Sequence, residues 1–264
     1  MSILHIFLLI KFMYKESLIS KITLIIKVKG KKIMKKLKNT LIGFVAAISL
    51  TSVAYAGSFG LGVTGSYTNI DASGSETAGD ETTTTSVDNN AFLGSVFIEY
   101  SFNDASWASA GNGFTFGAEH TPGTADVSDK VKSRTDTELS ITGTTTTTST
   151  SRTQTAQAEV DNYNNFYIEV PLYKSLFVKA GMSSIDVTTK ETTNGANGGT
   201  YGNASLDGTN LGIGLKGVTA SNIIWKLAYE ETNFDTLNLT STTSNTIKAD
   251  LDTSEVALSI GYRF

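Results

Sequence analysis

Between residues 57 and 264, eight segments alternate apolar and polar side chains at every second position. The first is SFGLGVTGSY at residues 58–67, and the last is EVALSIGYRF at residues 255–264. Because side chains of a β-strand point alternately to its two faces, this period predicts eight strands with one apolar face each. The same region is rich in Thr and has Pro only at positions 122 and 171, which favours an all-β fold.

The charged residues inside these segments all lie on the face opposite the apolar one. They are Glu99, Glu119, Glu169, Lys179, Lys216, Lys226, Glu230, Glu255 and Arg263. If the apolar face points outward, five glutamates and four basic residues meet inside a closed sheet, where each buried charge needs a partner. We therefore predict an ion-pair network in the interior. A pore lined by these charges is the alternative.

The connections between segments alternate between short and long. One short link is only Lys174-Ser175, whereas the link after the third segment runs roughly from 121 to 162. Short and long connections with an even strand number are typical of a closed antiparallel transmembrane β-barrel with long external loops. We predict eight strands, with ten as the alternative if residues 126–143 form an extra hairpin. The Thr content of the long links favours strand pairs that extend beyond the membrane.

The first 56 residues differ from the rest in charge. They hold ten lysines and one acidic residue, whereas residues 57–264 hold eleven basic against twenty-four acidic residues, a net charge of −13. Residues 34–56 have a lysine-rich start, a short apolar stretch and a small-x-small site at Ala54 and Ala56, which predicts a signal peptide cleaved before Gly57. We interpret residues 1–33 as an upstream extension of the gene prediction, and residues 57–264 as the barrel domain.

Composition excludes several kinds of function. The chain has no cysteine and only two histidines, so thiolate chemistry and a histidine-based metal cluster are excluded. An acidic barrel domain argues against nucleic acid as a partner. We expect no catalytic, cofactor-binding or metal-binding residues, no cofactor and no enzymatic activity.

The signal peptide, the eight-segment rhythm and the ending VALSIGYRF together resemble the small outer-membrane β-barrels of Gram-negative bacteria, of the OmpA, OmpX and opacity type in the porin-like superfamily. The resemblance covers about residues 57–264. It implies integral location in the outer membrane, contact with lipid and lipopolysaccharide, and handling by periplasmic chaperones and the barrel assembly machinery. The assembly signal would be Leu258, Ile260, Tyr262 and Phe264.

From this resemblance and the polar loops we expect a structural or surface-interaction protein with a charge-plugged lumen. The external ligand is left open. The alternative is a narrow porin that passes small solutes or ions across the outer membrane.

Overall fold

The computed structural model describes residues 57–104, 107–109, 112–128, 132–142, 146–192 and 199–264. Among these residues no helix is long and apolar enough to cross a membrane. The ten strands are β1 (Gly57–Ala78), β2 (Glu81–Asp104), β3 (Gly113–Asp126), β4 (Lys132–Thr142), β5 (Thr146–Tyr173), β6 (Leu176–Thr192), β7 (Ala204–Val218), β8 (Ile223–Phe234), β9 (Leu237–Thr240) and β10 (Thr246–Arg263). The predicted extension and signal peptide, with Ala54 and Ala56, lie outside the described residues.

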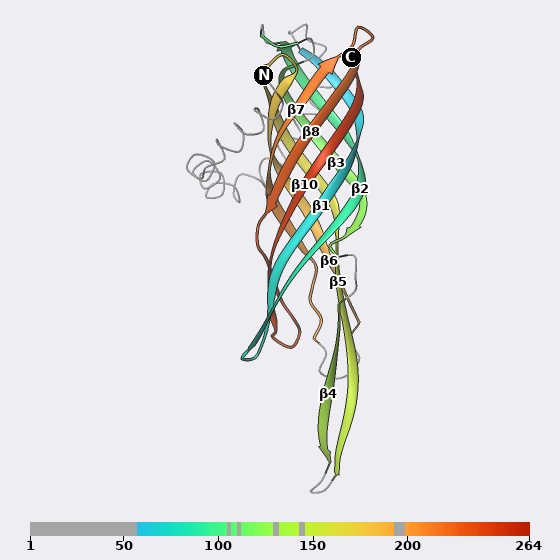
Figure 1. Ribbon diagram of the computed structural model, residues 1–264, viewed down its shortest axis with the longest axis vertical. Coiled ribbons are helices and arrows are strands. Elements are labelled where there is room, and N and C mark those ends of the chain that lie inside the picture. Colours follow the sequence, from blue (N-terminus) through green and yellow to red (C-terminus); the bar gives the residue numbers. More distant parts are fainter. Residues whose placement is uncertain (1–56, 105–106, 110–111, 129–131, 143–145, 193–198) are drawn as a thin grey trace, which may run out of the picture. The chain divides into compact units, whose positions relative to one another are not determined.

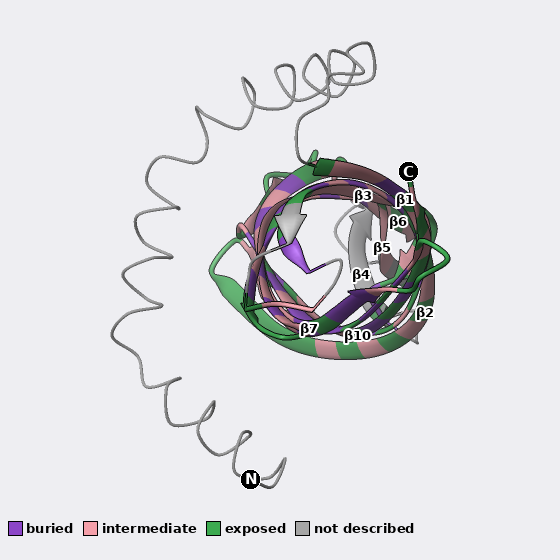
Figure 2. Cartoon of the chain, turned by 90° about the horizontal axis from the view of Figure 1, so that it is seen from above, coloured by how far each residue is buried: buried purple, intermediate pink, exposed green. Residues whose placement is uncertain are grey.

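Eight of the strands form a closed antiparallel ring in the order β1-β2-β3-β5-β6-β7-β8-β10 (Figure 2). Strand β10 pairs back onto β1 without a register shift, from Gly60 opposite Arg263 to Thr77 opposite Thr246. The predicted eight-stranded closed barrel is therefore confirmed. The alternative of ten ring strands is wrong, because β4 pairs with β5 and β9 with β10, and both lie outside the ring.

The apolar face of the ring points outward. Along β8, buried and exposed residues alternate strictly from Ile224 to Tyr229, with Ile224, Lys226 and Ala228 buried and Trp225, Leu227 and Tyr229 exposed. Exposed fractions on this outer face reach 64% for Leu258, 70% for Phe264 and 85% for Phe92. Soluble monomers rarely expose a contiguous apolar surface of this extent. The outer face is therefore suited to an apolar surrounding.

The long Thr-rich connections are largely strand pairs, as their composition predicted. Strands β1 and β2 stay in register up to Ala78 opposite Glu81, with a two-residue turn at Gly79 and Asp80. Strand β4 and the first part of β5 form a second hairpin that extends beyond the others (Figure 1). The C-terminal end of β10 lies at the opposite end of the ring, as do the short links.

Candidate functional site

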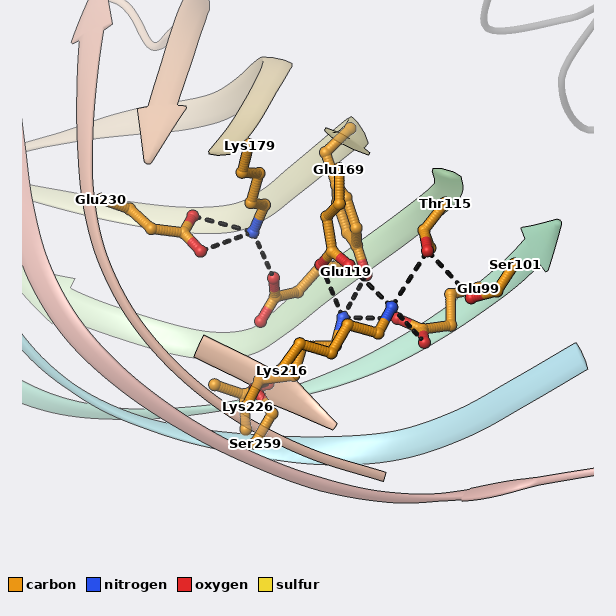
Figure 3. Close-up of polar contacts among 12 residues, drawn as sticks. Glu99, Ser101, Thr115, Glu119, Glu169, Lys179, Lys216, Lys226, Glu230 and Ser259 are labelled. Atoms are coloured by element: carbon orange, nitrogen blue, oxygen red, sulfur yellow. Dashed lines mark hydrogen bonds and ion pairs between the residues drawn. The ribbon is translucent and has the colours of Figure 1, made fainter. Parts of the chain in front are cut away.

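The barrel interior contains a cluster of two lysines and two glutamates from four strands (Figure 3). Lys216 Nζ on β7 lies 2.9 Å from Glu99 Oε1 on β2 and 2.7 Å from Glu169 Oε2 on β5. Lys226 Nζ on β8 lies 2.7 Å from Glu169 Oε1 and also contacts Glu99. Strand β2 is adjacent to neither β7 nor β8, so these contacts cross the interior. The four side chains together carry no net charge.

The ion-pair cluster is shielded from solvent. The side chains of Glu99, Glu169 and Lys216 are at most 2% exposed. Lys216 also donates to Thr115 Oγ1 at 3.0 Å. Buried charges are tolerated only when partners and hydrogen bonds replace their water, and this cluster has both.

Lys179 on β6 forms a second group of ion pairs. Its Nζ lies 2.8 Å from Glu230 and 3.3 Å from Glu119, and its cation lies 4.2 Å from the Tyr167 ring centroid. Glu255 lies opposite Glu230 in the β10–β8 register and accepts a hydrogen bond of 3.1 Å from Thr68 Oγ1.

Arg263, at the end of β10, donates from its Nε–H to the Ser58 hydroxyl on β1. Of the nine residues predicted for the interior, seven therefore form the two groups of ion pairs. Glu255 is placed beside the second group, and Arg263 at the end of the ring.

Aromatic rings fill the interior beside the ion pairs because glycines leave them room. A Cβ atom at Gly117 would lie 2.2 Å from the Tyr167 ring, and one at Gly62 would lie 2.5 Å from the Phe97 ring. Contacts this short leave no space for a side chain. Lys226 in turn lies 4.7 Å from the Phe97 ring centroid. The glycines therefore leave room for the Tyr167 and Phe97 rings to lie beside the lysines.

Toward the hairpin end, the interior changes from charged to apolar. The core there consists of Ile70, Val127, Ile185, Val187, Leu206, Phe234 and Leu251, each at most 8% exposed. On β1, Tyr67 is 47% exposed and Ile70 only 1%, three positions further on. On β8, Tyr229 is 45% exposed and Phe234 7%, five positions further on. Since both separations are odd, the large apolar residues change face along the strand.

Sequence reasoning missed this apolar interior cluster. The signal is nevertheless present, because its members on β6, β7, β8 and β10 lie at the parity of the interior charges, and Ile70 on β1 lies at the parity opposite to the outer face. They stand among Ser, Thr, Asn and Asp residues, between the segments with the regular alternation.

Small cavities border both layers in the described part of the barrel. A cavity of about 10 Å³ borders the ion pairs at Glu119, Lys179 and Lys226. One of about 60 Å³ lies under the apolar cluster, between Glu119 and Glu255 on one side and Phe234 on the other. A cavity needs about 10–15 Å³ of such space to hold one water molecule, so the smaller cavity has room for at most about one. In the described part of the chain, no three His, Cys, Asp or Glu residues are grouped to hold a metal ion.

No family model and no curated protein match the chain. Solved structures that match include Ail, the attachment invasion locus protein of Yersinia pestis, at 14% identity, with 79% of this chain and 97% of that chain covered and a TM-score of 0.36. Another is the outer-membrane protease OmpT from Escherichia coli, at 7% identity, with 82% and 100% covered and a TM-score of 0.39. Neisserial surface protein A matches at 9% identity, with 78% and 97% covered and a TM-score of 0.33.

The comparison corrects one expectation. We expected no enzymatic activity, but one of the matched structures is an outer-membrane protease, so this expectation does not stand. At 7% identity and this TM-score, no residue role is transferred from that protein.

Proposed function

We propose that residues 57–264 form an integral outer-membrane barrel that holds Thr-rich hairpins outside the cell for contact with surface partners. The observation that carries the proposal is the belt of exposed apolar side chains around a closed sheet. A sheet in lipid must pair all its backbone groups, and only closure achieves this. From Phe59 to Tyr67, eight steps of about 3.3 Å at a tilt of about 40° give a belt roughly 20 Å high, close to that of known barrels.

In this proposal the lumen is closed by charge pairs on one side and by the apolar cluster on the other. The buried Lys216 and Lys226 pairs, the packed rings and the small size of the cavities support a stiff plug. An eight-stranded barrel is only wide enough for side chains to fill it.

Biogenesis follows from the same proposal. Export uses a signal peptide at residues 34–56, cleaved between Ala56 and Gly57. In the membrane, lipid and lipopolysaccharide surround the apolar belt. The barrel assembly machinery recognises Leu258, Ile260 and Tyr262 on the outer face of β10 together with Phe264, which follows it. Periplasmic chaperones handle the chain before insertion. The exposure of these four residues, between 44% and 70%, supports this role.

Fractionation and gel mobility test the membrane assignment. The protein is expected in the outer-membrane fraction, and its mobility should change on boiling because the closed sheet resists unheated detergent. Protease added to intact cells should cut the hairpins and spare the ring. Recovery in the soluble fraction, or identical mobility before and after boiling, would overturn the assignment.

Planar-bilayer recording tests the closed lumen. Purified refolded protein is expected to give no steady conductance. Uniform channels would overturn the plug and support the narrow porin, and Lys179→Ala would then change ion selectivity because Lys179 lies beside the smaller cavity.

A further inference from the structure

The β4–β5 hairpin carries an unpaired strand edge along β4. Among the described strands, β4 pairs with β5 alone, so its other edge has no strand beside it there. Unpaired edges present a row of backbone donors and acceptors, and they are templates for a further strand.

The charges of β4 are arranged symmetrically. The strand reads KSRTDTELSIT, so that Lys132, Arg134, Asp136 and Glu138 occupy every second position, two basic residues followed by two acidic ones. Alternate positions of a strand share one face. In an antiparallel pair of two β4 strands centred on Thr135, Lys132 stands opposite Glu138 and Arg134 opposite Asp136.

This register joins opposite charges at every charged position, and the two-fold axis produces each pair twice. Opposite charges across a strand pair are favourable, and like charges directly opposite are unfavourable. Centring the pair on Asp136 or on Arg134 instead keeps only two of the four opposite pairs and sets two like charges face to face. A parallel, in-register pair opposes like charges at all four positions. The strand therefore selects one antiparallel register with another copy of itself.

The direction of pairing decides where the second copy lies. The hairpin continues along the barrel beyond the other hairpins (Figure 1). Barrels in one membrane point their β4 strands the same way, which gives parallel neighbours. Barrels in two facing membranes point them in opposite ways, which gives the antiparallel arrangement. An isologous contact of this kind closes on itself.

We propose that β4 is a homophilic contact strand, by which copies of this protein on two facing outer membranes pair edge to edge. The inference rests on the proposed function, because it needs the hairpin outside the cell. A single pair of short strands binds weakly, and many copies on each surface make the contact strong through avidity.

Charge exchange tests the pairing. One variant, Lys132→Glu with Arg134→Asp, makes all four β4 charges acidic; the other, Asp136→Arg with Glu138→Lys, makes them basic. Each is expressed on cells or in vesicles of its own fluorescent colour. The native protein is expected to cluster cells, and each variant alone to lose clustering at least tenfold. Mixing the two variants should restore clusters of both colours.

Two controls sharpen the result. The variant with all four changes reverses the order of the charges and keeps the symmetry, so it should cluster cells as the native protein does. Changing Asp80→Lys and Glu81→Arg, at the tip of the β1–β2 hairpin, should leave clustering unchanged. Clustering by the all-acidic variant alone, or no clusters in the mixture, would overturn the inference.

Staining of a tagged hairpin on intact cells distinguishes a failure of this inference from a failure of the proposed function. An epitope tag placed in residues 143–145 is stained on intact cells for every variant. A displayed protein that does not cluster cells overturns the homophilic contact alone. A native protein whose tag is hidden overturns both.

Discussion

Phe264 donates its backbone N–H to the carbonyl oxygen of Phe59 at 2.7 Å, and the centroids of the two rings lie 6.4 Å apart. This contact is at the end of the seam between β10 and β1, where the sheet closes on itself. This seam is the pairing that removes the free edges of the sheet, so its end is a sensitive place for assembly.

Removing Phe264 is expected to lower the amount of protein in the outer membrane several-fold. The change removes a hydrogen bond of the seam, the ring contact and an aromatic residue of the proposed assembly signal. The amount of heat-modifiable protein in outer-membrane fractions measures it. Phe116→Ala removes an outward aromatic away from the seam, 56% exposed against 70% for Phe264, and should have a smaller effect. Equal amounts for both variants would contradict this role of Phe264.

Lys216→Met is expected to reduce the free energy of unfolding by about 3–5 kcal/mol, because it leaves Glu99 and Glu169 with one lysine between them. Adding Glu169→Gln should recover part of the loss by restoring the charge balance. Urea unfolding in detergent micelles, followed by gel mobility, measures both. Lys190→Met breaks a more exposed pair with Glu159 and should change stability by no more than about 1 kcal/mol.

Gly117→Val is expected to destabilise the barrel by about 1–3 kcal/mol or more, because its side chain would overlap the Tyr167 ring. Displacing Tyr167 also disturbs its contacts with Lys179 and Lys226. The temperature at which the unheated gel band is lost should fall. Gly65→Val serves as the control, since a Cβ atom there meets no atom within 4 Å. A matching fall for both variants would argue against the packing explanation.

Phe234→Ala is expected to reduce the free energy of unfolding by about 3–5 kcal/mol, as for other buried aromatic residues. Its ring packs in the apolar cluster, 6.5 Å from the Tyr163 ring centroid. Phe92→Ala removes a ring that is 85% exposed, and it should have a much smaller effect in micelles. Tryptophan fluorescence during urea titration measures both. A loss at Phe92 as large as at Phe234 would mean that the cluster is not a folding core.

The eight ring strands, their outer face and the interior position of the charges could be predicted because alternation is a local property of the chain. The ion-pair partner of each interior charge could not be predicted. Lys226 meets Glu99, 127 positions away, and this depends on how far neighbouring strands are staggered around the ring. The contacts between interior glycines and aromatic rings were also beyond reach, because Gly117 and Tyr167 meet only through the register between β3 and β5.

The change of face at Tyr67 and Ile70 constrains which length changes the chain tolerates. From Phe59 to Tyr67 the outer face of the strand is suited to an apolar surrounding. From Ile70 onward the outer face is suited to water. Deleting or inserting one residue between the two zones would put them out of phase, so that Ile70 would turn outward and its polar neighbours inward. Inside the ring strands, insertions and deletions are therefore tolerated when they change the length by two residues. At the hairpin tips, changes of one residue are tolerated as well.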